Sequence, residues 1–202
     1  MNISIIGDGN VGGTLGKRFM DAGHQITFGV REPETKPDNE QLRYSSVTEA
    51  IKSNSIIFLC IPWKATVDML KEIDDASGKI FVDCTNPIGP GFQLEKGHTT
   101  SGAENLAELM PTATLVKAFN STGFENMINP QFPDGKTMML TCSDNPEAGE
   151  QVAQLASDIG FEGVYTGPLY HARYIEPLAM LWIDMAIKQK RGRNFAFAML
   201  NR

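Results

Sequence analysis

A glycine-rich turn near the N-terminus constrains the fold of this chain more than any other stretch. A short apolar run, Ile3–Ile6, leads directly into the motif GDGNVG at Gly7–Gly12. Beyond the motif, apolar residues recur at the spacings of four and three that are typical of a helix, namely Val11, Leu15, Phe19 and Ala22. Gly23 is a suitable C-terminal cap, and a second apolar run, Gln25–Gly29, follows it. The order strand, glycine turn, helix, strand is that of a dinucleotide-binding unit.

Each glycine of the motif has its own physical task. Gly7 permits the tight turn after the strand, and Gly9, without a Cβ, lets a pyrophosphate approach the backbone. Gly12 allows the helix to pack closely on the strand. The N–H groups at the start of the helix then attract the phosphates. Because the motif stands in the required strand–turn–helix context, it predicts a dinucleotide site, and the alternative is a glycine turn without a ligand.

The residues after the second strand favour NADP(H) over NAD(H). Units that bind NAD usually carry Asp or Glu about 20 residues past the fingerprint, where it holds the ribose 2′-OH. This chain has Val30 and Arg31 there, and the planar guanidinium of Arg31 can face a 2′-phosphate. Lys36 adds positive charge from the following loop. The alternative is a solvated Arg31, or one paired with the neighbouring Glu32.

Composition and charge exclude several classes of function. The chain has 202 residues, 42% hydrophobic and 21% charged, which is typical of a globular protein. The net charge of −6 argues against a nucleic-acid partner. A basic cluster at 188–193 is interpreted as a solvated helix end. No basic and apolar leader precedes Ile3–Ile6 and no apolar run reaches the ~18 residues of a membrane span, so we expect a cytoplasmic protein without a membrane segment.

The cysteines and histidines predict no metal site. Cys60, Cys84 and Cys142 lie in separate strand-like runs without a CxxC pair, and the histidines are scattered. We expect the cysteines to be buried, reduced thiols.

The rest of the chain alternates between strand-like and helical stretches. Strands are expected at 55–61, 79–84, 114–119, 138–142 and 163–166. Helices are expected at 46–52, 64–73, 103–110, 123–128 and 146–159, with irregular loops at 37–39 and 88–97. This alternation predicts an α/β fold, a Rossmann-type doubly wound, mostly parallel sheet covered on both faces.

A small C-terminal helical extension completes the expected organisation. We expect an NADP-binding domain over 1–167 and a helical segment over 168–202. The helix expected at 173–189 is apolar around much of its circumference, which fits a core helix, the wall of a ligand pocket or a homodimer contact.

The ends of the other strands supply further candidates for the site. Ligands of open α/β sheets bind beyond the carboxyl ends of the strands. These ends carry Ile61, Pro62 and Trp63, then Asn86 and Pro87, and finally Ala118 and Asn120. The asparagine amides suit a carboxamide or a ribose, and Trp63 suits a pocket wall. The alternatives are a turn for Asn86 and a helix cap for Asn120.

No residue stands out as a general acid or base, so no catalytic residue is predicted. Lys117 lies inside a strand, and Asp83 is expected to brace a loop. Arg173 and Glu176, three residues apart, are expected to pair with each other. Oxidation of an alcohol needs a proton acceptor near the reacting carbon, whereas transfer between two redox cofactors needs mainly alignment of two rings.

Motifs along nearly the whole chain resemble a known family. They are IIGDGNVGGTLG, FGVR, CIPW, VDCTNPI, LVKAFNSTGFENM and GPLYHARYIEPLAMLWI. In combination they resemble the coenzyme F-420-dependent NADP reductases, whose acceptor is a 5-deazaflavin. The oxidoreductase domain of the six-transmembrane metalloreductases is similar too, especially around VKAFN and ARYIEPL.

The resemblance implies roles for individual residues. Asp8, Asn10 and Val11 would line the pyrophosphate, Arg31 would hold the 2′-phosphate, and Ile61 and Pro62 would lie against the nicotinamide half. The family often has Ser where this chain has Val30, so one hydroxyl donor to the phosphate is lost. Some deazaflavin-using members carry His where this chain has Asn120, which matches the metalloreductase-like version.

Three functional hypotheses follow. The first is an NADP(H)-dependent oxidoreductase, which passes a hydride between nicotinamide and a deazaflavin (coenzyme F-420) or flavin stacked by the last helix. The second is a small β-hydroxyacid-type dehydrogenase, which needs a large helical domain with a catalytic lysine; only Lys188 and Lys190, near a polar helix end, follow Gly167. The third is a non-catalytic NADP(H)-binding sensor.

Overall fold

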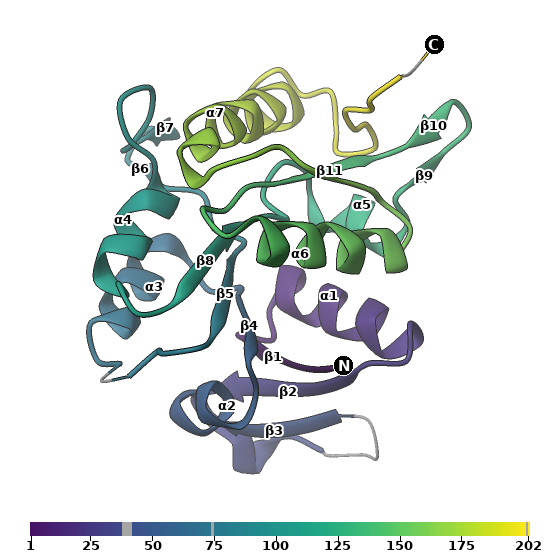
Figure 1. The fold of residues 1–202 in the computed structure, drawn as a ribbon. Helices are drawn as coiled ribbons and strands as arrows, with labels where there is room; N and C mark the ends of the chain where they lie inside the picture. The colour runs from purple at the N-terminus through teal and green to yellow at the C-terminus, as the bar shows by residue number, and fades with distance from the viewer. Residues whose placement is uncertain (38–41, 74, 201) are drawn as a thin grey trace.

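The computed structural model describes residues 1–37, 42–73, 75–200 and 202, and its centre is a six-stranded parallel sheet (Figure 1). The strand order is β3-β2-β1-β4-β5-β8, and every neighbouring pair is parallel. The strands are β1 (Asn2–Ile6), β2 (Gln25–Val30), β3 (Leu42–Ser46), β4 (Ile56–Leu59), β5 (Ile80–Asp83) and β8 (Thr114–Lys117). The predicted Rossmann-type sheet is therefore confirmed.

Helices cover both faces of this sheet. One face packs against α1 (Asn10–Asp21), α5 (Phe124–Ile128) and α6 (Pro146–Asp158). The other packs against α2 (Val47–Ser53), α3 (Trp63–Leu70), α4 (Gly102–Leu109) and α7 (Ala172–Ile183). Successive strand residues therefore enter different cores: Phe58 joins the first and Leu59 the second. This double burial explains why these strands appear as continuous apolar runs.

Short elements extend the sheet. β11 (Met138–Thr141) and β12 (Glu162–Tyr165) form a parallel pair, which an antiparallel bridge between Lys117 and Cys142 joins to β8. Two hairpins, β6–β7 (Ile88–Gly89 and Gln93–Leu94) and β9–β10 (Gln131–Phe132 and Gly135–Lys136), project from the body. Single 3₁₀ turns lie at Pro33–Thr35 and Leu169–His171.

Three of these elements differ from the sequence prediction. β3 was not predicted because it is an edge strand of half-buried and polar residues, which leaves no apolar run. The stretch 88–97, expected to be irregular, holds the β6–β7 hairpin, whose turn places Gly91 and Phe92 at positive φ. The β9–β10 hairpin was also missed. The loop predicted at 37–39 lies mostly outside the described residues.

The C-terminal helix is not uniform. α7 ends at Ile183 and continues as a π-helical turn, Asp184–Lys188, instead of running unbroken to residue 189. One side of α7 is buried through Ile175, Ala179 and Trp182, while Leu181 is 50% exposed. Among the described residues, no helix is both long and apolar enough to cross a membrane.

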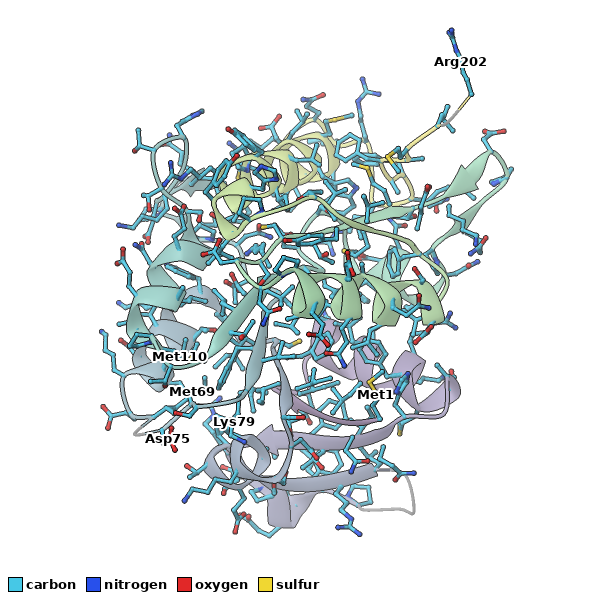
Figure 2. All side chains as sticks on the ribbon, in the orientation of Figure 1. Met1, Met69, Asp75, Lys79, Met110 and Arg202 are labelled. Carbon is cyan, nitrogen blue, oxygen red and sulfur yellow. The ribbon has the colours of Figure 1, made fainter. Side chains whose placement is uncertain are left out.

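The amino ends and the carboxyl ends of the parallel strands carry different residues. Figure 2 shows Met69, Lys79 and Met110 gathered at the edge where β5 and β8 begin. Lys79 there donates a hydrogen bond to the carbonyl of Asn54 at 2.9 Å. The loops that carry the predicted site residues follow the carboxyl ends of the strands.

Candidate functional site

The strand order reverses between β1 and β4, and open α/β sheets bind their ligands at such a reversal, in the crevice beyond the carboxyl ends of the strands. The glycine turn follows β1 and the Ile61–Pro62 segment follows β4, so both border the crevice. Backbone hydrogen bonds hold the strand ends together there. Gly7 N–H donates to Gly29 O at 3.0 Å, and Cys60 N–H donates to Ile6 O at 2.9 Å.

The glycine turn has the geometry that the motif requires. Gly7 has φ +94°, a conformation that other residues rarely adopt. A Cβ on Gly12 would lie 2.0 Å from the carbonyl oxygen of Gly7, so only glycine lets α1 approach the turn this closely. A Cβ on Gly9, in contrast, would meet nothing within 4 Å. Gly9 is the N-cap of α1 and makes no side-chain cap, so the open space beside it faces helical N–H groups suited to an anion.

The segment after β2 carries the predicted charges. Arg31 is exposed and makes no ion pair with any described residue, Glu32 included. Lys36 reaches back to the glycine turn, where its Nζ lies 2.6 Å from Oδ2 of Asp8, and it lies over the Tyr44 ring, 5.9 Å from the centroid. The hydrogen bond to Asp8 raises the pKa of Lys36. Val30 is buried in the core, so it offers a ligand little beyond its backbone.

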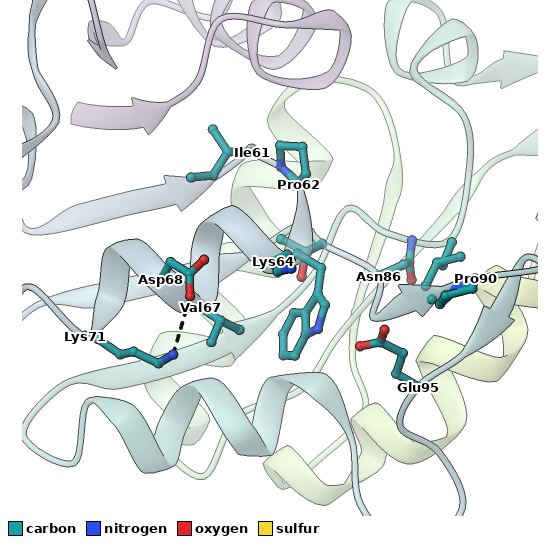
Figure 3. A pocket seen from close by; sticks show the side chains of 13 residues that line it. Ile61, Pro62, Lys64, Val67, Asp68, Lys71, Asn86, Pro90 and Glu95 are labelled. Atoms are coloured by element: carbon teal, nitrogen blue, oxygen red, sulfur yellow. Dashed lines mark hydrogen bonds and ion pairs between the residues drawn. The ribbon is translucent and has the colours of Figure 1, made fainter.

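A cavity of about 860 Å³ opens beside the crevice (Figure 3). The ends of β4 and β5, helix α3 and the β6–β7 hairpin surround it. Its walls combine apolar and polar side chains, namely Ile61, Pro62, Trp63, Lys64, Val67, Asp68, Lys71, Thr85, Asn86, Ile88, Gly89, Pro90 and Glu95. Lys71 is paired with Asp68 at 3.4 Å, whereas Lys64 has no partner among the described residues. The volume lies within the range of small-molecule sites.

Two asparagines join the strand ends at the cavity. Asn86 Nδ2 donates to the carbonyl of Asn120, and Asn120 Nδ2 donates to Asn86 Oδ1, each at 3.0 Å. Phe119, the residue before Asn120, has φ +55°, and Asn120 Oδ1 is buried without a partner among the described residues. The helix-cap alternative for Asn120 is wrong, because the N-cap residue of α5 is Gly123 and no side chain caps this helix.

Beneath the cavity lie three completely buried charged side chains. Lys117 Nζ lies 2.8 Å from Asp83 Oδ2 and 3.4 Å from Glu176 Oε1. Asp83 Oδ1 accepts both the N–H and the hydroxyl of Thr85, at 2.9 and 2.7 Å, as expected for a residue that braces a loop. The predicted pair between Arg173 and Glu176 is wrong.

The two partners of that predicted pair both contact α4. Arg173 forms a bidentate pair with Glu104, with a shortest distance of 2.6 Å. Glu176 accepts hydrogen bonds from the N–H groups of Gly102 and Ala103. The two residues lie on one face of α7, but α4 offers each of them a better partner than the other one does.

Burial and pairing oppose each other in the charge cluster. Burial lowers the pKa of Lys117, but Asp83 and Glu176 outweigh it, so the pKa is raised and the ammonium persists. Burial raises the pKa of Glu176, against the opposing effect of Lys117. Burial likewise raises the pKa of Cys142 to about 12. All three cysteines are free, and no His, Cys, Asp or Glu cluster within the described ranges could hold a metal ion.

The structure brings together only part of the predicted site. The cavity gathers Ile61, Pro62, Trp63 and Asn86, and Asn86 links it to Asn120. The glycine turn, Arg31 and Lys36 lie along the neighbouring crevice, while Pro87 and Ala118 are buried behind it.

Sequence reasoning missed several residues of the cavity wall. The missed residues on α3 and at its C-cap recur at helical spacing after Trp63, a signal that could have placed them on one face of the helix: they are Lys64, Val67, Asp68 and Lys71. The sequence shows that Lys117 lies inside a strand, but only the pairing of β5 with β8 shows that Asp83 lies beside it.

Comparison with known proteins confirms the resemblance. Residues 2–87 match the family described as NADP oxidoreductase, coenzyme F420-dependent. Metalloreductase STEAP3 of Rattus norvegicus is 32% identical over 187 residues, which cover 89% of this chain. The chain spans little more than a third of that relative, 37% of its length.

Solved structures share the fold. A proposed F420-dependent NADP reductase from Arthrobacter sp. FB24 superposes with a TM-score of 0.87 at 24% identity, covering 98% of this chain and 100% of that one. A reductive aminase from Aspergillus terreus, in complex with NADPH and ethyl levulinate, superposes with a TM-score of 0.72 at 18% identity, covering 95% of this chain and 62% of that one. At these identities the likeness shows the fold alone.

The contrast between Gly12 and Gly9 yields a prediction about stability. Gly12→Ala places a methyl 2.0 Å from Gly7 O, and we expect it to lower the free energy of unfolding by about 1–3 kcal/mol in urea denaturation. Gly9→Ala adds a methyl in open space and should cost less than about 1 kcal/mol. Equal losses in the two variants would contradict the close approach of α1 to the turn.

Proposed function

We propose that this protein is an NADP(H)-dependent oxidoreductase that passes a hydride between the nicotinamide and a flat ring acceptor, a deazaflavin (coenzyme F-420) or a flavin. The observation that carries the proposal is a cavity of about 860 Å³ that adjoins the crevice formed by the glycine turn and the end of β4. A dinucleotide in the crevice would bring its nicotinamide end to Ile61 and Pro62, at the mouth of the cavity. The two rings could then meet there.

The glycine turn fits a pyrophosphate. The space beside Gly9, which a Cβ would fill, is open, and the N–H groups at the start of α1 face it without a side-chain cap. In this arrangement Asp8, Asn10 and Val11 line the dinucleotide through the backbone of the turn. The A. terreus reductive aminase, which shares the fold, holds NADPH.

Arg31 and Lys36 would select the 2′-phosphate. Arg31 has no competing partner among the described residues, so its guanidinium is available for a bidentate contact. Lys36 is held by Asp8 at 2.6 Å, which keeps a second cation over the same end of the crevice. A 2′-phosphate would compete with Asp8 for Lys36, and because solvent screens that exposed pair, the phosphate has only a weak interaction to replace.

The cavity suits a planar acceptor. When bound, the nicotinamide supplies the hydride, and the chain's own part is to hold two rings in line and exclude water. Trp63, Val67 and Pro90 offer apolar walls, while the amide of Asn86 offers hydrogen bonds at the floor. The family description, with its coenzyme F420, supports a deazaflavin, and a flavin, as another flat redox ring, is the alternative.

We further propose a homodimer formed through the exposed apolar stripe of the 168–202 segment. This stripe consists of Tyr174 and Leu181 on α7 and of Tyr170 in the 3₁₀ turn before it, which are 64%, 50% and 44% exposed. A second copy would cover it, whereas the buried side of α7 already packs in the core. We also place the protein in the reducing cytoplasm, because its three cysteines are free.

Anaerobic mixing tests the reaction. NADPH and oxidised deazaflavin, mixed with the enzyme, should lose the deazaflavin absorbance in a 1:1 ratio with NADPH oxidised. If the deazaflavin does not bleach, FMN or FAD is tested in the same way. Tight NADPH binding without reduction of any of these rings would refute the oxidoreductase and favour the NADP(H) sensor.

Arg31→Ala tests the cofactor preference. We expect the Kd for NADPH to rise about tenfold or more while that for NADH stays unchanged, because only NADPH carries the 2′-phosphate. Arg43→Ala is the control, because it removes an exposed arginine near the amino end of β3, at the opposite end of the strands from the proposed site. It should change neither constant. An equal rise in the Kd for NADPH and for NADH would contradict the assignment of Arg31 to the 2′-phosphate.

Light scattering tests the dimer. The wild type should have twice the chain mass of 22.2 kDa, and Leu181→Asp should return it to the monomer by placing a charge in the apolar contact. Leu200→Asp, on a residue 82% exposed outside the stripe, should leave the dimer intact. A monomeric wild type would refute this contact.

A further inference from the structure

Three charged side chains are completely buried next to the cavity. Asp83, Lys117 and Glu176 come from β5, β8 and α7, and each is 0% exposed. Burying charge costs free energy unless every group is paired and hydrogen-bonded. A protein with apolar residues of similar volume in place of a buried ion pair is often equally stable. The contacts of this cluster lead to the cavity, which suggests a role beyond stability.

We propose that Lys117 and Asp83 are positioning residues, which fix the Thr85–Asn86 segment at the cavity floor and thereby set where the nicotinamide half of the dinucleotide lies. This inference rests on the NADP(H) site proposed above. Neither Lys117 nor Asp83 lines the cavity, so each acts through Thr85.

Thr85 is held at all three of its polar groups. Its N–H and its hydroxyl both donate to Asp83 Oδ1, at 2.9 and 2.7 Å, and its carbonyl accepts from Lys117 Nζ. Lys117 in turn donates to Asp83 Oδ2 at 2.8 Å. Hydrogen bonds to charged groups are stronger than those between neutral groups, so Thr85 has little freedom to shift.

The constraint passes from Thr85 to the asparagine pair. Asn86 is the next residue, lines the cavity and exchanges two 3.0 Å hydrogen bonds with Asn120. The buried Oδ1 of Asn120 has no partner among the described residues, so one unused acceptor lies directly behind the cavity residue Asn86. A shift of Thr85 would therefore displace both amides.

Glu176 extends the same network to the opposite wall. It lies 3.4 Å from Lys117 and accepts the N–H groups of Gly102 and Ala103 at the start of α4. A Cβ on Gly102 would lie 3.1 Å from both Pro87 and the Trp63 indole, so the α4 start packs directly against the cavity wall. One ammonium thus connects the floor of the cavity with its aromatic side.

If the buried charges had a purely structural role, disrupting them would weaken the binding of every ligand in proportion to the loss of folded protein. Two ligands separate the roles: NADPH, and adenosine 2′,5′-bisphosphate, which lacks the nicotinamide half. If the network positions the nicotinamide end alone, only NADPH binding should respond to its disruption.

Calorimetric titration of matched threonine variants tests the inference. Thr85→Val removes the hydroxyl held by Asp83, and we expect the Kd for NADPH to rise about tenfold with that for the bisphosphate unchanged. Thr85→Ser keeps the hydroxyl and should restore tight NADPH binding. Thr141→Val is the control, because it removes an equally buried hydroxyl that donates to Gly149 O at 2.9 Å away from the cavity, and it should change neither constant.

Lys117→Met tests the ammonium directly. We expect the same selective loss of NADPH binding in the folded protein, as judged by circular dichroism; should this variant fail to fold, the Thr85 pair decides. Unchanged NADPH binding in Thr85→Val, or equal loss of both ligands, overturns the positioning role and leaves the NADP(H) proposal standing. A wild-type protein that binds neither ligand overturns the proposed function and this inference with it.

Discussion

The close approach of α1 to the end of β1 is the constraint on which the site depends. Because Gly12 has no Cβ, the start of the helix can lie against the carbonyl of Gly7, whose own positive φ makes the turn. The same approach brings the helix beside Cys60, 3.1 Å from where a Gly12 Cβ would lie, and so beside the end of β4. One missing side chain therefore places an anion-attracting helix end next to the point where the strand order reverses.

A second constraint acts on the far side of the crevice. There the strand ends are held by charge rather than by close backbone packing, since the Lys117 ammonium joins Asp83 on β5 to Glu176 on α7. These three groups must keep their relative positions, because a movement that separated them would leave a buried carboxylate without its partner, which is strongly unfavourable. The glycine turn thus defines where phosphates can approach, and the buried charges define the shape of the cavity beyond them.

The sequence predicts the sheet and the glycine turn well because both rest on local patterns. Apolar runs such as 55–61 can only be buried on both faces, and a GxGxxG motif between strand and helix has few other uses. The edge strand β3 pairs with β2 across an intervening loop, and the two hairpins consist of two-residue strands, so none of them leaves an apolar pattern long enough to recognise. Arg173 was assigned to Glu176 by spacing, but Glu104, 69 residues away, offers it a bidentate contact.

The cavity was harder to predict than the crevice for a related reason. Its walls come largely from α3 and from the β6–β7 hairpin, and beyond Trp63 and Ile88 neither element carries a motif. Lys117 and Asp83 could be seen as charged residues inside apolar strands, yet only the register of β5 with β8 shows that they face each other. Charge inside a buried strand is expensive unless its partner is adjacent. A lysine and an aspartate in neighbouring parallel strands are therefore best interpreted together, as one buried unit whose contacts lead to the site.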